Sequence, residues 1–311
     1  MSFRLFIYYC ALMGAWTGIV GWAVGRLAAD AIVSEDDLIL NIGLRGLFLG
    51  AMVTLGLSVV DALWNVGWRN VRVFAARVIT AVALGALGGF LGGGLAQWLI
   101  GQFGNQWPIV GFFVLGWTLA GLIMGASVAA FEWILSRIRQ RNRRAATAKL
   151  LRCTLGGGLG GLIGALASYM LREGWIVLFE SKDPALLWSP NALGLVTFGL
   201  FVGLLVGLTQ VALKPAWIRI EAGFRPGREL ILSKDTTKIG RSETADIGLF
   251  GDPLIDPTHA QILHEGPTYF VEDASPAAST FVNDRKIRGR TPLASGDLIR
   301  IGKSVLRFSL R

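Results

Sequence analysis

Six long apolar runs limit what this sequence can fold into more than any other feature. They lie near residues 4–25, 44–66, 78–100, 108–134, 153–171 and 191–213. Each run is long enough to cross about 30 Å of hydrocarbon as a helix, and none shows the alternation that barrel strands require. Because 53% of the residues are hydrophobic and only 16% are charged, an ordinary soluble fold of this length is excluded. We therefore expect an α-helical membrane bundle of about six transmembrane helices over residues 1–214.

The charges between the runs predict the orientation of the bundle. The segments after the first and fifth runs are acidic and the segment after the third is uncharged, whereas those after the second, fourth and sixth runs are basic. By the positive-inside rule, both termini then lie in the cytoplasm. The basic segment from Arg137 to Arg152 is either a solvated loop or a surface for anionic lipid headgroups or the C-terminal domain. A signal peptide cleaved near Ala29-Asp30-Ala31 is the alternative interpretation of the first run, and it leaves the C-terminal domain in the cytoplasm.

Glycine spacing indicates an internal repeat of three helical hairpins. In each hairpin both apolar runs carry small residues four positions apart, which lets backbones approach closely where lipid gives helices no hydrophobic drive to associate. We predict glycine-zipper packing between the helices, and the lining of a pore stays open as the alternative. The glycines that carry this prediction are Gly85, Gly89, Gly93, Gly156, Gly160, Gly164, Gly199, Gly203 and Gly207.

Two acidic residues, Asp61 and Glu132, lie near the expected cytoplasmic ends of apolar runs, at similar places in the first two repeats. Ionisable groups are costly at such depths and often functional. We expect interfacial pairing with the loop residues Arg69 and Arg137, and a functional role is the alternative. Gln210 occupies the corresponding place in the third repeat, so a ring of three acids is incomplete.

Residues that could support catalysis or bind a cofactor are scarce. Cys10 and Cys153 lie in or beside apolar runs, and the two histidines, His259 and His264, both lie near the C-terminus. We find no metal-ligand spacing, no nucleophile–base pair and no paired carboxylates. The sequence therefore predicts no disulfide, no metal, no cofactor and no enzymatic activity. Nucleic-acid binding is not expected either, because the basic residues lie mostly between apolar runs rather than on a soluble face with exposed aromatic residues.

The composition changes abruptly after Lys214-Pro215. From Trp217 onward, short β-rich runs alternate with turn residues. We predict strands at residues 218–221, 229–232, 237–239, 260–264, 268–272, 280–282, 298–301 and 305–310. Several short strands at such spacing favour an all-β sandwich, which we assign to residues 215–311.

Six phrases follow one another in this region: Gly240-Arg241-Ser242, Ala245-Asp246-Ile247, Thr258-His259-Ala260-Gln261-Ile262, Tyr269-Phe270-Val271-Glu272-Asp273, Thr280-Phe281-Val282-Asn283, and residues 293–302. Taken together, they resemble the forkhead-associated (FHA) domain family across essentially all of residues 217–311. The resemblance implies a β-sandwich that binds phosphothreonine peptides through the loops at one end.

The resemblance also implies roles for individual residues. Arg241 would help to hold the peptide, Thr280 would lie near the phosphothreonine, and Asn283 would bind the peptide backbone. His259 would brace the loops from behind. The implied partner-binding residues are Arg241, Ser242, Asp256, Thr258, Thr280 and Asn283, and the implied structural residues are Gly240, His259, Gly296 and Asp297.

The sequence departs from the family pattern where the phosphate would bind. The family's Ser-Arg-x-His phrase reads Asp256-Pro257-Thr258-His259, so a carboxylate replaces a hydroxyl donor and a ring without a donor replaces a guanidinium. Asp284 also replaces the usual glycine after Asn283. Because a carboxylate repels a phosphate, we expect phosphothreonine binding to be weakened or lost. We also hypothesise that Asp256 pairs internally with Arg241.

These expectations favour a membrane-anchored FHA scaffold or signalling adaptor that recruits a cytoplasmic protein partner. The expected location is the bacterial plasma (inner) membrane, with several membrane passes, a cytoplasmic FHA domain and contact with membrane lipids. A homo-oligomer is compatible with the glycine-rich helices. A channel or transporter gated by the FHA domain is the alternative function, although the apolar runs carry few polar residues.

Overall fold

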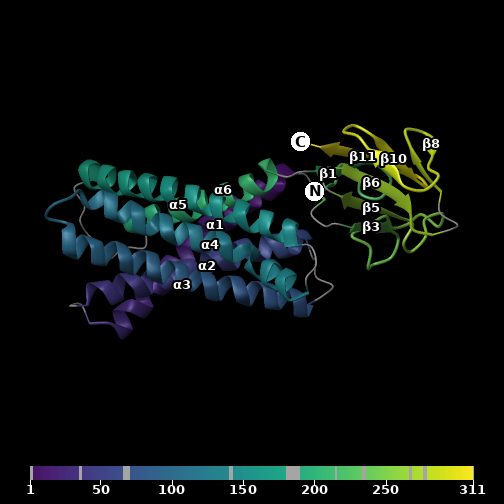
Figure 1. Cartoon of the computed structure of the whole chain (residues 1–311). Helices are drawn as coiled ribbons and strands as arrows, with labels where there is room; N and C mark the ends of the chain where they lie inside the picture. Colours follow the sequence, from purple (N-terminus) through teal and green to yellow (C-terminus); the bar gives the residue numbers. More distant parts are fainter. Residues whose placement is uncertain are drawn as a thin grey trace. The chain divides into compact units, whose positions relative to one another are not determined.

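The computed structural model of this protein describes residues 3–34, 37–65, 71–139, 143–179, 190–213, 216–232, 236–265, 268–275 and 279–310. The chain divides into two compact units (Figure 1): a helical unit from Arg4 to Ala212 and a β unit from Leu213 to Arg311. We describe each unit by itself.

Six long helices, which run side by side in Figure 1, form the helical unit. They are α1 (Phe3–Ile32), α2 (Leu38–Asn65), α3 (Val71–Phe103), α4 (Ile109–Arg139), α5 (Arg143–Phe179) and α6 (Pro190–Ala212). All six are long and apolar enough to cross a membrane, which confirms the predicted number of apolar helices.

The helices extend beyond the apolar runs that predicted them. For example, α5 begins at Arg143, ten residues before the predicted start at residue 153. Arg72 and Arg77, which we counted with the loop after the second run, therefore lie on a helix, and that assignment was wrong. Lys149, in the basic segment from Arg137 to Arg152, also lies on a helix. Apolar length measures only the part of a helix that suits lipid, whereas helical hydrogen bonding continues through basic residues, which have good helix propensity.

The helical unit repeats one packing arrangement three times. The second helices of the three hairpins, α2, α4 and α6, contact one another. Between them, α3 contacts α2 and α4, and α5 contacts α4 and α6. The remaining helix, α1, packs against α6 through Gly14 and against α2 through Gly21. The six helices thus form two groups: α2, α4 and α6 lie inside, and α1, α3 and α5 each cover the seam between two of them.

Pairs of glycines mark the closest crossings between these helices. Gly50 meets Gly85 between α2 and α3, Gly121 meets Gly157 between α4 and α5, and Gly199 meets Gly14 between α6 and α1. At each crossing a methyl group added to the first glycine would collide with the backbone oxygen of the second. A methyl group on any of the nine glycines singled out from the sequence would likewise meet a neighbouring helix at 3.0 Å or less. Backbone contact at these points depends on glycine.

The β unit is a sandwich of two sheets. Its strands are β1 (Ala216–Ala222), β2 (Glu229–Ile231), β3 (Thr236–Gly240), β4 (Ile247–Gly248), β5 (Ala260–Glu265), β6 (Thr268–Asp273), β7 (Thr280–Val282), β8 (Arg285–Lys286), β9 (Thr291–Leu293), β10 (Leu298–Ile301) and β11 (Ser304–Leu310). One sheet has the order β2-β1-β11-β10-β7-β8 and the other has the order β4-β3-β5-β6-β9. All described pairs are antiparallel except β3 with β4.

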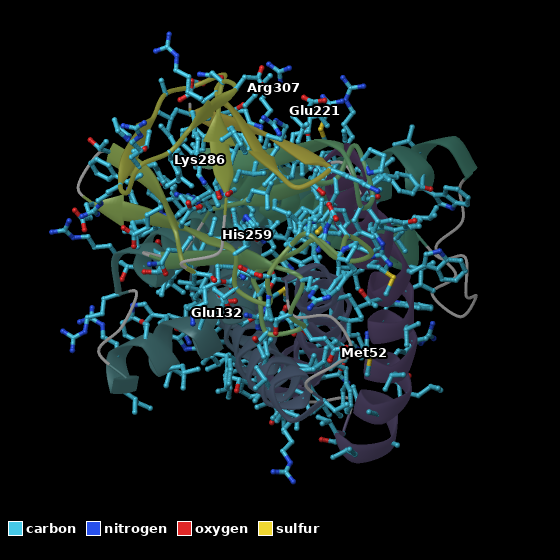
Figure 2. All side chains as sticks on the ribbon, turned by 90° about the vertical axis from the view of Figure 1, so that its right-hand side faces the viewer. Met52, Glu132, Glu221, His259, Lys286 and Arg307 are labelled. Carbon is cyan, nitrogen blue, oxygen red and sulfur yellow. The ribbon has the colours of Figure 1, made fainter. Side chains whose placement is uncertain are left out.

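Alternating side chains fill the space between the two sheets. Ile218 and Ile220 of β1 are fully buried, as are Ile262 of β5 and Phe308 of β11. Polar neighbours face outward; Glu221 of β1, for example, pairs with Arg307 of β11 at 2.8 Å (Figure 2). This period-two pattern predicted the eight longer or more regular strands. The sequence did not predict β4 and β8, because two residues carry too little alternation to be recognised. It did not predict β9 either, since Pro292 at its centre counts against a strand.

Candidate functional site

The pairing of β3, β5 and β6 brings three loops to one end of the sandwich. β3 ends beside the start of β5, where Ile239 pairs with Ala260, and Ala260 in turn pairs with Asp273 at the end of β6. The loop segments that follow or precede these positions are residues 240–246, 249–259, 274–275 and 279. We call these described residues the loop end. They include most of the partner-binding positions implied by the sequence.

A glycine holds two of these segments together. The backbone N–H groups of Arg241 and Ser242 donate to the carbonyls of Asp256 and Pro257, both at 3.0 Å. A Cβ at Gly240 would collide with the carbonyl of Pro257, so no larger residue fits there without moving the 256–257 segment. The position of Asp256 relative to Arg241 is therefore fixed by the backbone.

His259 braces the loops from inside. Its side chain is buried, and its ring nitrogens lie 3.2 Å from the backbone N of Asp256 and 3.3 Å from that of Ser279. A neutral imidazole accepts a hydrogen bond at only one nitrogen, so one of these contacts is a hydrogen bond at a time. Backbone bonds from His259 to Ile239 and from Ala274 to His259 complete the connection. Figure 2 marks this residue within the sandwich.

Asp256 carries the chemistry that distinguishes this site. Among the described residues, its buried oxygen Oδ2 has no hydrogen-bond partner, and its side chain makes no ion pair with the exposed Arg241. The hypothesis of an internal Asp256–Arg241 pair was therefore wrong, because only the backbones of the two residues are joined. A buried carboxylate oxygen without a donor is unusual and needs an explanation. The negative charge of this carboxylate opposes the binding of an anion nearby.

The hydroxyl groups near Asp256 are less available than the sequence implied. Oγ of Ser242 accepts from the backbone N of Thr244 at 3.1 Å and lies 2.8 Å from its hydroxyl, as in a local turn. Thr258 is half-buried. Thr280 is fully buried, and its N–H donates to Asp273 at 3.2 Å. The structure thus places the Thr280 hydroxyl in the core rather than on the binding surface.

Asn283 lies in the turn between β7 and β8. Asn283 and Asp284 have φ angles of 50° and 62°, as in a type I′ turn. The Asn283 amide donates to Asp297 at 2.8 Å and accepts from the N–H of Leu298 at 3.0 Å. Asp297 also accepts from Ala294 at 2.7 Å, next to Gly296 with its φ of 98°. These side chains connect two turns of the sandwich, so the Asn283 amide is occupied internally.

Sequence reasoning missed two residues of the loop end. Asp252 is buried and accepts from the N–H groups of Lys303 at 2.7 Å and Leu254 at 3.0 Å; these bonds lower the pKa of its carboxyl below the ordinary value. They tie the 249–259 loop to the turn before β11. Leu254, in contrast, is 68% exposed. The phrase Gly251-Asp252-Pro253 is typical of such a turn, whereas nothing in the sequence marked Leu254 as an exposed apolar residue.

A second group of charged residues lies inside the helical unit. Asp61 of α2 accepts from Arg77 of α3 at 3.1 Å and from Lys149 of α5 at 2.9 Å. Glu132 of α4 also pairs with Arg77, and it pairs with Lys149 at 3.2 Å. We call these four residues the ion cluster. Each acid contacts both bases, so the charges balance and join four helices.

The expected pairing with Arg137 was wrong, whereas the expected pairing with Arg69 stays a prediction. Arg137 places its guanidinium over the ring of Trp133, 5.1 Å from the centroid, and Arg69 lies outside the described residues. The bases that the structure describes come from the second turns of α3 and α5, 16 and 17 residues after the acids. Gln210, the third-repeat residue, is buried on α6.

Within the residues that the structure describes, no group of three or more His, Cys, Asp or Glu side chains could hold a metal ion. Cys10 and Cys153 are free and buried. The chemistry of the loop end is therefore that of hydrogen bonding, charge and apolar contact.

Comparisons with known proteins agree with this geometry. Residues 237–302 match the family model of the FHA domain. The FHA domain-containing protein FhaB of Mycobacterium tuberculosis is 24% identical over 135 residues, which cover 43% of this chain and 85% of FhaB. Two solved structures are similar to the sandwich. The FHA domain of the CT664 protein from Chlamydia trachomatis is 24% identical (31% of this chain, 98% of that chain, TM-score 0.29). The FhaA FHA domain complexed with the intracellular domain of Rv3910 is 26% identical (30% and 98%, TM-score 0.27).

The resemblance to the FHA family is therefore confirmed for the C-terminal sandwich, and no family model matches the helical region. FHA domains are phosphopeptide-binding modules rather than enzymes, and the helical region is unassigned.

Proposed function

We propose that this chain is a membrane-anchored FHA scaffold or signalling adaptor that recruits a cytoplasmic protein without requiring phosphothreonine. In this proposal residues 1–214 form the membrane anchor and residues 215–311 form the recruiting domain. The observation that carries the proposal is the carboxylate of Asp256, with Pro257 beside it, at the place where the family pattern has phosphate-binding Ser and Arg. The partner would supply a hydrogen-bond donor or a positive charge to Asp256 instead of a phosphate.

The exposed apolar surface of the loop end supports this mode of binding. Leu254 is exposed only two residues before Asp256, on a loop that Asp252 fixes to the rest of the sandwich. Fixed loops cost little ordering entropy on binding. An exposed leucine beside a half-buried carboxylate favours a protein surface that combines an apolar group with a donor or a positive charge.

Restoring the family phrase provides the sharpest test of the site. We expect the full-length protein in detergent to show no phosphate-dependent binding to a phosphothreonine peptide library in fluorescence anisotropy. The double variant Asp256→Ser with Pro257→Arg should gain such binding, because it replaces the repelling carboxylate with two donors. Adding Arg241→Ala should remove the gained binding. Tight, phosphate-dependent binding by the unchanged protein, abolished by Arg241→Ala, would refute the proposal.

The anchor and its orientation need a separate test. If residues 1–214 span the membrane with both termini inside, the chain should resist extraction by alkaline carbonate. Protease added to sealed right-side-out vesicles should then leave residues 217–311 intact, and added to inverted vesicles it should remove them. Removal of the sandwich from the outside would overturn the proposed orientation.

The partner can be sought by crosslinking in native membranes. A protein recovered with the full chain but not with a chain lacking residues 217–311 would be the recruited partner. Recovery should fall for Leu254→Asp, which places a charge on the proposed contact. Arg307→Ala, on strand β11 of the sandwich, serves as the matched control.

A channel or transporter is the second candidate, and the ion cluster is the observation that favours it. Ionisable side chains within apolar helices often mark an ion or proton pathway. Purified protein in liposomes should show no flux of small ions above empty liposomes if the scaffold proposal is right. Flux that Glu132→Gln abolishes would favour the channel.

A further inference from the structure

A basic hollow lies where α4 and α5 meet. It has a volume of about 360 Å³ and is lined by Arg137, Arg143, Arg144, Thr147, Ala148 and Leu151. None of these three arginines forms an ion pair with a carboxylate in the described part of the chain. The sequence offers them no acid nearby, because no Asp or Glu occurs between Glu132 and Glu173. These arginines therefore carry positive charge that no described carboxylate neutralises, while apolar carbon atoms supply most of the surface inside the hollow.

An apolar groove of about 380 Å³ lies further along the same two helices. Its walls include Leu84 of α3, Ile123 and Trp133 of α4, and Leu150 and Thr154 of α5. No charged residue lines it. A polar ligand would gain nothing there, whereas a hydrocarbon chain would fill it at no cost in hydrogen bonds.

The hollow and the groove form one continuous stripe. On α5, residues 143, 147, 150 and 154 recur at steps of three or four, so they share one helix face. On α4, residues 130, 134 and 137 do the same. Trp133 of the groove packs against the guanidinium of Arg137 in the hollow. One ligand with a charged head and an apolar tail can occupy both.

We propose that this stripe is a binding site for an anionic phospholipid. The headgroup phosphate binds the guanidinium groups of Arg137, Arg143 and Arg144, and an acyl chain lies in the groove between α3, α4 and α5. Arginine suits this task because its planar fork of donors matches a phosphate. Lys149 on the same helix is not available, because Asp61 and Glu132 already bind it. The inference rests on the proposed membrane insertion of the helical unit.

Native mass spectrometry of the full-length protein in detergent tests the site. The probes are phosphatidylglycerol and phosphatidylcholine with identical acyl chains. We expect retention of phosphatidylglycerol but not of phosphatidylcholine. Arg137→Gln with Arg144→Gln should weaken this retention roughly tenfold or more, given the usual contribution of a basic residue near anionic lipid. The matched control is Arg4→Gln with Arg72→Gln, which removes two exposed arginines outside the hollow and should leave retention unchanged.

Two further measurements distinguish binding of the whole lipid from binding of its headgroup alone. A phosphatidylglycerol with a photoreactive acyl chain should crosslink to residues 122–134 and 150–154, and Thr154→Phe, which fills the groove but keeps every arginine, should reduce this crosslinking several-fold. Excess glycerol phosphate should not displace the lipid. Displacement by glycerol phosphate, equal loss in both double variants, or equal retention of phosphatidylcholine would each overturn the inference.

The proposal of a membrane anchor and the proposal of this lipid site can be refuted separately. A chain that carbonate extracts from membranes contradicts the proposed function, whereas the lipid measurements are made in detergent and still report on the stripe.

Discussion

The ion cluster and the loop end both contain charged side chains, but those of the ion cluster are paired with one another, whereas Asp256 and Arg241 of the loop end are not. In the ion cluster, Asp61 and Glu132 each contact both Arg77 and Lys149, and the four charges balance. At the loop end, a buried oxygen of Asp256 has no hydrogen-bond partner among the described residues, while Arg241 is exposed. The closed network joins four helices, whereas the carboxylate of Asp256 joins nothing that the structure describes. In the proposed function, the ion cluster serves assembly of the helical unit and the loop end serves recognition of a partner.

The largest expected effect comes from opening the ion cluster. Asp61→Asn leaves Arg77 and Lys149 with one acidic partner between them, in surroundings where Asp61 is only 1% exposed. Removing one partner of a buried ion pair costs about 3–5 kcal/mol, and we expect a loss of this size in unfolding of the purified chain in detergent. The control is Asp30→Asn, which removes an exposed pair with Arg45 and should cost less than about 1 kcal/mol. Equal losses in the two variants would show that burial of the network contributes nothing.

A smaller effect should follow from Asp252, the satisfied carboxylate of the loop end. Hydrogen bonds from the N–H groups of Lys303 and Leu254 hold its pKa below the ordinary value. The folded protein therefore binds this proton less readily than the unfolded chain, so the stabilisation is complete above about pH 4 and is lost as the pH falls through the lowered pKa. Asp252→Asn should weaken the sandwich at neutral pH and should flatten its acid dependence.

Hydrogen exchange in peptides from residues 249–259 and 298–310, compared at about pH 5 and at lower pH, measures this effect. The same acid dependence in the unchanged protein and in Asp252→Asn would exclude Asp252 as its source.

Removing the carboxylate of Asp256 should have the opposite effect on stability to removing that of Asp252. Because its buried oxygen lacks a partner, Asp256→Ala should cost no stability and should gain up to about 1 kcal/mol, while recovery of the crosslinked partner falls. Thermal unfolding measures the change in stability, and the membrane pull-down measures the recovery of the partner. A loss of stability above about 2 kcal/mol would show that this carboxylate has a structural role after all.

The smallest effect is expected at Asp284. Its φ of 62° lies in a region that suits glycine better, and its carboxylate is 90% exposed in its pair with Arg300. Asp284→Gly should therefore stabilise the sandwich by about 0.5 kcal/mol, with no change in partner recovery. A destabilised variant would mean that the pair with Arg300 outweighs the strain.

Whether a structural feature can be predicted from the sequence depends on how far apart in the sequence the contacting residues lie. The six apolar helices and the eight longer strands follow from periodicity and length, which are local properties. Partners in the ion cluster do not, because Asp61 meets Lys149 only after α2 and α5 have packed together. The distribution of charge along the sequence also placed Arg77 in a loop, whereas the structure buries it on helix α3.

The candidate site shows the same limit. Resemblance pointed to loop segments that the structure brings together, since Gly240 and His259 join them. It implied ligand contacts for Thr280 and Asn283, whose side chains the structure places in the core and in an internally bonded turn. Whether a hydroxyl or amide reaches solvent depends on neighbours that are distant in the sequence, such as Asp297, and a motif does not contain that information.

The crossing of Gly14 on α1 with Gly199 on α6 has a consequence for biosynthesis. At a synthesis rate of about 5–20 residues per second, the first helix emerges roughly 10–40 s before its neighbour exists. During that time its glycine face is uncovered, and α1 and α6 can pack together only when nearly the whole helical part has left the ribosome. We therefore expect that face to contact lipid or another protein until the last helix arrives.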